Sequence, residues 1–147
     1  MNPITFSDFE IGQKFVSNAI TVTDAHIVLF VGLSGDFNPL HVNEEFAKNT
    51  IFKGRIAHGL LTLSLMSGHI GMLVAGTAIV FLGMNIKFTA PVKPGDTIRS
   101  EAIVKDKQFK QKYGGGIVTF KFEIKNQRNE KVVEGELFLL ISDKRIG

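Results

Sequence analysis

The chain has 147 residues, of which 44% are hydrophobic and 21% charged, and this is the size and composition of one ordinary globular domain. It contains no cysteine, which excludes disulfides, thiolate metal sites and cysteine nucleophiles and fits a protein of the reducing cytoplasm. The formal net charge of +3 is small, and the basic residues are spread among acids, whereas polyanion-binding proteins usually gather them on one face. We therefore expect no nucleic-acid partner, and we interpret the excess charge as favouring solubility or a small phosphorylated ligand.

No segment of the sequence indicates targeting or membrane insertion. Residues Met1 to Phe9 lack a basic start followed by an apolar run, so we expect no signal or transit peptide. The longest apolar stretch, Gly59 to Ala75, is interrupted by hydroxyl residues, a histidine and glycines, and it is too short and too polar for a membrane span. Because no repeat, low-complexity tract or linker divides the chain, residues 1–147 are predicted to form a single domain.

The first predicted elements are a strand and a helix. Lys14–Thr21 has the pattern of a short strand. Ala25–Leu33 is predicted to be a helix, because its apolar residues recur at helical spacing behind Thr23, a preferred N-cap residue. Ser34 and Gly35 are expected to end this helix.

An irregular loop and a second, very short helix are expected next. Asp36–His41 is predicted not to be regular helix, because Pro39 disfavours helical geometry at Asn38. Asn43 is expected to cap a short helix that follows it, Glu44–Ala47. A long helix then runs from near His58 to about Ala75, where Gly76 ends it. That helix is apolar on nearly every face, so we expect it to be buried on all sides.

The second half of the chain has the two-residue period of strands, with β-branched and aromatic residues between turn clusters. The predicted strands are Ala78–Thr89, Thr97–Phe109, a strand through Val118–Ile124, and Val132–Ser142; the predicted connections are Ala90–Asp96, a hairpin loop at Gly114–Gly116, and Asn126–Glu130. These elements predict an α+β fold in which the sheet wraps around the long helix. The edges of such a sheet favour edge-to-edge pairing in a homodimer.

Asp36 and His41 lie in the same irregular loop and form a candidate acid–base pair. A carboxylate held there can accept a proton from a water molecule, which the imidazole orients or whose proton it relays. The alternative is a purely structural loop, in which Asp36 and Asn38 bond their own backbone and His41 is a half-buried residue at a helix entry. Composition alone favours this structural alternative.

Gly59, at the start of the apolar helix, is a candidate for binding a carbonyl group. The first N–H groups of a helix have no intrahelical partner and favour negative charge, and a glycine lets a substrate approach them closely. Alternatively, Gly59 only allows the helix to pack against a strand. Ser67, about two turns further on, is a candidate partner of Asp36 or of the water, although a helical serine more often bonds a carbonyl one turn back.

Other chemistries lack a motif in this sequence. Of the four histidines, His26 and His69 are expected to be structural or surface residues. The histidines show no metal-ligand spacing, so we expect no metal site. No Gly-x-Ser-x-Gly stretch, glycine-rich phosphate loop or His-Glu-x-x-His motif occurs.

Three segments of the sequence occur in the order found in one known family. They are Ser34-Gly35-Asp36-Phe37-Asn38-Pro39-Leu40-His41 with the small residue Ala47 behind it, then Ile56-Ala57-His58-Gly59-Leu60-Leu61, and then Phe88-x-x-Pro-Val-x-x-Gly-Asp as far as Asp96. Together they resemble the MaoC-like dehydratase family, and within it the (R)-specific enoyl-CoA hydratases, the hydratase 2 group. The resemblance is strongest from about Phe30 to Val104.

The resemblance implies a hot-dog fold, a long helix wrapped by a curved antiparallel sheet, working as a homodimer. It implies that Asp36 and His41 hold and activate water, and that the N–H of Gly59 polarises a thioester carbonyl. It further implies that Ser67 supports the aspartate and that Asn38 shapes the site. The implied reaction is reversible hydration of a trans-2-enoyl-CoA to an (R)-3-hydroxyacyl-CoA. It needs no metal or redox cofactor, since coenzyme A enters as part of the substrate.

Three other functions remain open at this level. The same chemistry on a carrier-protein thioester would make the protein a 3-hydroxyacyl-carrier-protein dehydratase. A hot-dog acyl thioesterase would hydrolyse the thioester instead of hydrating the alkene. A non-catalytic module would bind acyl thioesters without changing them.

Overall fold

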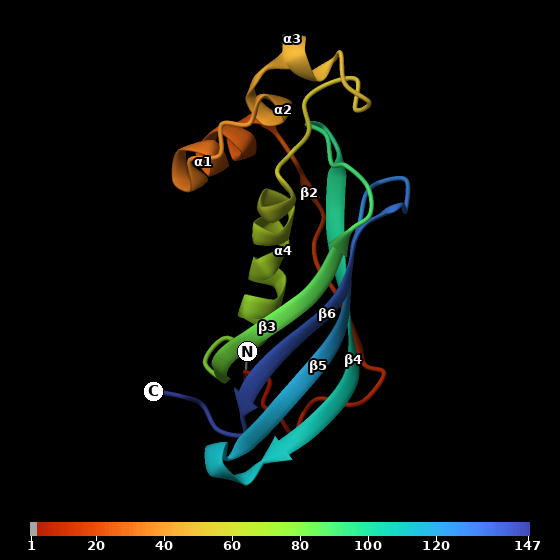
Figure 1. Ribbon diagram of the computed structural model, residues 1–147. Coiled ribbons are helices and arrows are strands. Elements are labelled where there is room, and N and C mark those ends of the chain that lie inside the picture. The colour runs from red at the N-terminus through yellow and green to blue at the C-terminus, as the bar shows by residue number, and fades with distance from the viewer. Residues whose placement is uncertain (1–2) are drawn as a thin grey trace.

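The computed structural model describes residues 3–147, so Met1 and Asn2, the first residues of the N-terminal segment considered above, lie outside the described residues. Six strands form one antiparallel sheet in the order β1-β4-β5-β6-β3, with β2 paired to β4. A long helix, α4, lies against one face of this curved sheet, and three short helices stand together at one end of it (Figure 1). This is the hot-dog arrangement expected from the sequence.

The helices are α1 (Asp24–Ser34), α2 (Pro39–Val42), α3 (Glu44–Ala47) and α4 (Gly59–Leu73), and the strands are β1 (Lys14–Val16), β2 (Ile20–Thr21), β3 (Ala78–Phe88), β4 (Thr97–Lys110), β5 (Gly115–Lys125) and β6 (Lys131–Ser142). Most bounds lie within two residues of the prediction. The predicted strand over 14–21 is broken into β1 and β2, both paired to β4. Within residues 3–147, no helix has both the length and the hydropathy needed to cross a membrane.

One side of α4 forms the centre of the hydrophobic core, and the other side is open. Leu61, Met66 and Ile70 are buried against the sheet. Leu60 and Met72, by contrast, are 63% and 77% exposed. The expectation that this helix is buried on all sides is therefore wrong for the single chain, because the sheet curves around only part of the helix circumference.

The hairpin between β4 and β5 differs from its prediction in a way that explains two glycines. The turn is made by a 3-10 helix at Gln111–Tyr113 and by Gly114, whose φ of 56° is left-handed. Gly115 and Gly116 belong to β5. A Cβ atom at these two positions would lie 2.1 Å and 2.3 Å from main-chain oxygens of Ile141 and Gln108. These two glycines therefore allow close approach of neighbouring backbones. The predicted hairpin loop at Gly114–Gly116 is confirmed for Gly114 and is wrong for Gly115 and Gly116, which lie in the strand.

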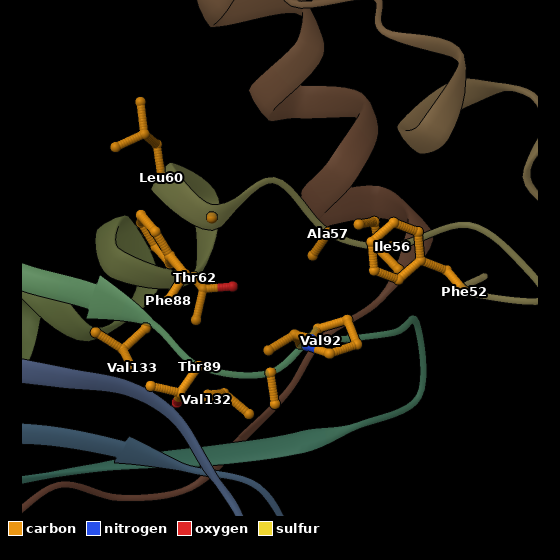
Figure 2. Close-up of a pocket in the computed structure, with 13 residues that line it drawn as sticks. Phe52, Ile56, Ala57, Leu60, Thr62, Phe88, Thr89, Val92, Val132 and Val133 are labelled. Atoms are coloured by element: carbon orange, nitrogen blue, oxygen red, sulfur yellow. The ribbon is translucent and has the colours of Figure 1, made fainter. Parts of the chain in front are cut away.

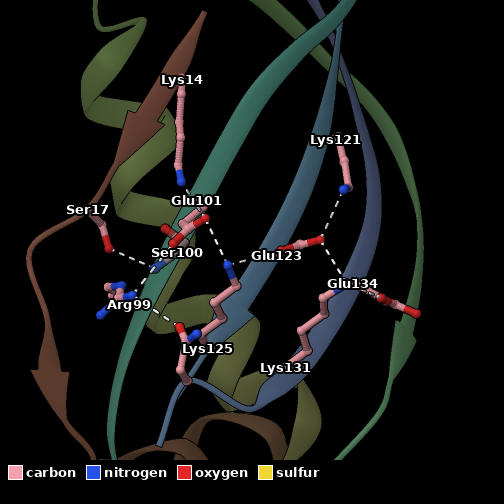
Figure 3. Close-up of polar contacts among 11 residues, drawn as sticks. Lys14, Ser17, Arg99, Ser100, Glu101, Lys121, Glu123, Lys125, Lys131 and Glu134 are labelled. Carbon is pink, nitrogen blue, oxygen red and sulfur yellow. Dashed lines mark hydrogen bonds and ion pairs between the residues drawn. The ribbon is translucent and has the colours of Figure 1, made fainter. Parts of the chain in front are cut away.

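The two faces of the sheet alternate in polarity as the sequence pattern predicts. On β5, Phe120, Phe122 and Ile124 are fully buried on the α4 side. The opposite face carries interleaved acids and lysines, and Glu101 lies at its centre between Lys14 and Lys125 (Figure 3). Hydrogen bonds from these two lysines lower the pKa of Glu101 from its ordinary value of 4.5 to about 2.

Candidate active site

The loop after α1 holds Asp36 by short-range hydrogen bonds. Gly35 ends α1 with a left-handed φ of 71°, and its N–H donates to the main-chain oxygen of Val31. The Asp36 N–H donates to Ser34 Oγ over 3.2 Å, and the Asn38 N–H donates to Asp36 Oδ1 over 3.1 Å. These bonds are the local backbone contacts that the structural alternative expected. They leave Asp36 exposed and its second carboxylate oxygen available to a ligand.

Asn38 and Pro39 start a single helical turn, α2, which places His41. Asn38 has an extended ψ of 129° and accepts the Leu40 N–H on its side chain, so it is an N-cap, and Pro39 occupies the first helical position. The expectation that Asp36–His41 contains no regular helix is wrong for residues 39–41. The restriction by proline acts on Asn38, which lies outside the helix, while proline itself fits a helix start.

The imidazole of His41 is oriented by a main-chain carbonyl. Nδ1 of His41 lies 2.8 Å from the oxygen of Ile56. A carbonyl oxygen can only accept a hydrogen bond, so the ring hydrogen is on Nδ1 and Nε2 carries a lone pair. His41 is half-buried. A half-buried imidazole with a free Nε2 acceptor is suited to take a proton from water.

His58, which the sequence marked only as the start of the long helix, completes the cluster. One potential ligand atom from each of Asp36, His41 and His58 lies within 4.8 Å of the other two. The rings of His41 and His58 stack with centroids 3.7 Å apart and an interplanar angle of 29°. Because imidazole lone pairs lie in the ring plane, nearly parallel rings do not converge on one metal ion. The geometry therefore favours a proton-transfer cluster over a metal centre.

Gly59 packs tightly against β3. A Cβ atom at Gly59 would lie 2.7 Å from the ring of Phe88, so the glycine is needed for this contact whatever else it does. The N–H groups of Gly59 and Leu60 donate to no other group of residues 3–147. Unpaired N–H groups at the start of a helix are available to an oxygen of a ligand. Both interpretations of Gly59 are therefore compatible with the geometry.

Ser67 does not contact Asp36 in the single chain. Its Oγ donates to the main-chain oxygen of Ser64 over 2.7 Å, which is the local bond that a helical serine usually makes. Ser67 is exposed and lines an apolar cavity of about 570 Å³ along the open flank of α4. Its supporting role for Asp36 therefore stays a prediction.

The other two histidines have the structural roles that were expected. His26 accepts the main-chain N–H of Thr23 at the start of α1 over 3.0 Å. His69 bonds Ser100 over 2.8 Å, and burial lowers the pKa of His69.

A second apolar cavity, of about 490 Å³, lies beside the start of α4. Figure 2 shows the side chains that surround it, which come from the segment before α4, the first turn of α4, the end of β3 with the connection that follows it, and the start of β6. Its lining residues are Phe52, Ile56, Ala57, Gly59, Leu60, Thr62, Phe88, Thr89, Ala90, Pro91, Val92, Val132 and Val133. Ile56, whose oxygen orients His41, and Gly59 both line it, so an apolar ligand here lies close to the cluster.

Arg55 links the segment before α4, which carries Ile56 and His58, to two other helices. Its guanidinium contacts Asp24 Oδ1 over 2.8 Å and Glu44 Oε2 over 2.9 Å, so it joins the start of α1 to α3 and to the chain before α4. The hydrogen bond with Arg55 lowers the pKa of Glu44, and the same bond raises the pKa of Arg55. Sequence reasoning missed this contact because the three residues share no motif.

Residues 7–125 match the MaoC like domain. The chain belongs to the MaoC-like family. It is 37% identical over 136 residues to an (R)-specific enoyl-CoA hydratase of Rhodospirillum rubrum, a match that covers 92% of this chain and 90% of the relative. Among solved structures, it is similar to an Archaeoglobus protein described as a monoamine oxidase regulatory protein, with a TM-score of 0.90, 40% identity and coverage of 98% and 97% of the two chains.

A second solved structure resembles this MaoC-like chain over nearly its whole length. It is an unliganded (R)-hydratase from Pseudomonas aeruginosa, with a TM-score of 0.84 and 33% identity, and the match covers 98% of this chain and 89% of that one. The family and the fold expected from the sequence are therefore confirmed, and so is the similarity to the (R)-hydratase group.

Proposed function

We propose that this MaoC-like protein is a hydro-lyase that adds water to a trans-2-enoyl-CoA and forms an (R)-3-hydroxyacyl-CoA. The observation that carries the proposal is the free Nε2 acceptor of His41 in the same cluster as Asp36, next to an apolar cavity. The relatives named as (R)-specific enoyl-CoA hydratases, and one named as a 3-hydroxybutyryl-CoA dehydratase, support hydratase or dehydratase chemistry.

The proposed reaction moves one water molecule and leaves oxidation states balanced. Asp36 and His41 hold the water, and one of them takes a proton from it as its oxygen bonds to the β-carbon. The electron pair of the double bond shifts toward the thioester carbonyl, whose oxygen accepts the Gly59 N–H. A proton then returns from the acid–base pair to the α-carbon. Because no electron leaves the substrate, the reaction requires no redox cofactor, and coenzyme A takes part only as the carrier of the acyl group.

The proposal includes a homodimer. Strand β3 is an edge of the sheet, and its unpaired main chain can extend the sheet with a second copy. Phe81 and Met84 on β3 are exposed, and so are Leu60 and Met72 on the open side of α4. A second copy would cover this apolar surface, as soluble proteins generally require. Light scattering coupled to gel filtration measures the oligomeric state, and a monomer at micromolar concentration would contradict the proposed homodimer.

A cytoplasmic location of the protein also stays a prediction.

The first experiment mixes purified protein with crotonyl-CoA and follows the ultraviolet absorbance of the enoyl thioester, with chiral analysis of the product. Loss of absorbance and an (R)-3-hydroxy product are expected. Release of free thiol would instead indicate a thioesterase. Activity confined to carrier-protein thioesters would indicate the 3-hydroxyacyl-carrier-protein dehydratase, and saturable binding without turnover would indicate a binding module.

A further inference from the structure

His58 contacts both members of the proposed acid–base pair. Its Nε2 lies 3.1 Å from the main-chain oxygen of Asp36, and its ring stacks on His41 at a centroid distance of 3.7 Å. The centroid of the Phe30 ring lies 4.9 Å from that of His58. His58 is only 3% exposed and directly precedes α4, so it joins the exposed loop to a buried, rigid part of the fold.

The hydrogen bonding of His58 shows that packing alone does not explain a histidine here. Its partner at Nε2 is a carbonyl oxygen, so the ring hydrogen is on Nε2 and Nδ1 carries a lone pair. Nδ1 is buried and has no partner within residues 3–147. A buried acceptor without a partner costs stability, and a phenylalanine would fill the same space without that cost. The bond from Nε2 to the loop is the feature that a purely apolar ring could not supply.

The other hydrogen bonds of the loop join Asp36 to His41 only through the main chain of Asn38, whose N–H donates to Asp36 Oδ1 and whose oxygen accepts the His41 N–H. Asp36 is held by Ser34 and Asn38, which are its neighbours in sequence. The ring of His41 is held by Ile56. Within the described part of the chain, none of these bonds links Asp36 to the His41 ring, whereas His58 touches both.

We propose that His58 is a positioning residue that fixes the Asp36 main chain and the His41 ring relative to each other. The inference rests on the proposed hydration reaction and deepens it. His58 acts through Asp36 and His41 and takes no proton itself. Because a displacement of about 1 Å can lower turnover by about a hundredfold, loosening either contact is expected to act mainly on kcat.

Three substitutions separate the two contacts. His58→Gln keeps an N–H donor near the position of Nε2 and removes the ring, whereas His58→Phe keeps the ring and removes the donor. His58→Ala removes both. His69→Gln is the matched control, because His69 is a half-buried histidine of α4 with one side-chain hydrogen bond, to Ser100, away from the cluster. All four proteins are compared with the full-length wild type for crotonyl-CoA kinetics, melting temperature and peptide-level hydrogen exchange over residues 36–41.

The expected result is a kcat about tenfold lower for His58→Gln and for His58→Phe and about a hundredfold lower for His58→Ala, with KM changed by less than about twofold. Exchange of the 36–41 amides rises in these variants and not in His69→Gln. If His58→Ala does not fold, the Gln and Phe variants decide the question. Unchanged kcat with unchanged exchange in both of them overturns the inference, and so does a change confined to KM. If the wild type does not hydrate crotonyl-CoA, the proposed function fails, and the exchange comparison alone decides whether His58 positions the loop.

Discussion

Replacing Glu101 by glutamine is expected to remove a pH-dependent part of the stability of the sheet. Glu101 Oε2 lies 2.8 Å from Lys14 Nζ and 3.0 Å from Lys125 Nζ, with its side chain only 9% exposed (Figure 3). The hydrogen bond with Lys14, then that with Lys125, lowers the pKa of Glu101 from 4.5 to about 2. A lowered pKa in the folded state stabilises the fold above the unfolded value of 4.5, and this stabilisation is lost as the pH falls toward 2.

The size of the effect follows from the difference between the two pKa values. A difference of about 2.5 pKa units, at about 1.4 kcal/mol for each unit, gives an upper bound of about 3.5 kcal/mol. Lys14 is 48% exposed, so solvent screens its interaction, and we expect on the order of 1–2 kcal/mol at pH 7. The pKa values of other carboxylates, among them Asp96 and Glu123, are also lowered, so these groups too contribute to the pH dependence of stability. The informative quantity is therefore the difference between wild type and Glu101→Gln at each pH.

Urea unfolding at fixed protein concentration and ionic strength, at several pH values between about 2 and 7, measures that difference. It should be largest above pH 5 and should approach zero near pH 2. Glu134→Gln is the control, since Glu134 pairs with Lys131 across 3.2 Å and both side chains are more than 40% exposed. Its substitution should cost less than about 0.5 kcal/mol. A Glu101→Gln variant as stable as the wild type at pH 7, or a difference that does not change with pH, would refute the reasoning.

Three further predictions concern the site. Asp36→Asn and His41→Gln should each lower kcat for crotonyl-CoA by roughly a hundredfold or more without unfolding the protein, and full activity in either folded variant would remove it from the proposed pair. Gly59→Ala should cost about 1–2 kcal/mol by overlap with the Phe88 ring, and a double-mutant cycle with Phe88→Ala in urea unfolding should recover most of that cost; additive effects would show that this contact is not the reason for the glycine. Arg55→Met should speed hydrogen exchange in the segments around Asp24 and Glu44, because both ion pairs of Arg55 are lost. Protection equal to that of the wild type would show that these ion pairs do not hold the two segments together.

The order and type of the elements were accessible from the sequence, because they depend on local patterns. The alternation of Phe120, Phe122 and Ile124 with polar residues correctly predicted a strand with one buried face. Thr23 and Gly35 correctly marked the two ends of α1. The Asp36–His41 motif identified the loop, and its resemblance to a family predicted the hot-dog fold that the chain adopts.

Errors arose where a residue's effect depends on what it meets in space. Pro39 predicts the absence of a helix at Asp36–His41, yet it starts a helix, because Asn38 is available as a cap. The run of three glycines predicts a loop that includes Gly115 and Gly116, since nothing local shows that neighbouring strands leave no room for a Cβ atom there. The long helix was expected to be buried on all sides, although Leu60 faces away from the sheet.

The elements, the family and the residues that can carry acid–base chemistry follow from the sequence, because they depend on side-chain type and on spacing along the chain. How those residues act together depends on the folded chain. His58 and Ile56 lie far along the chain from Asp36 and His41, and folding brings them within hydrogen-bonding distance. Those contacts determine which nitrogen of His41 is free, and no local pattern could have specified it, because a hydrogen bond depends on distances of about 3 Å between segments that the fold alone aligns.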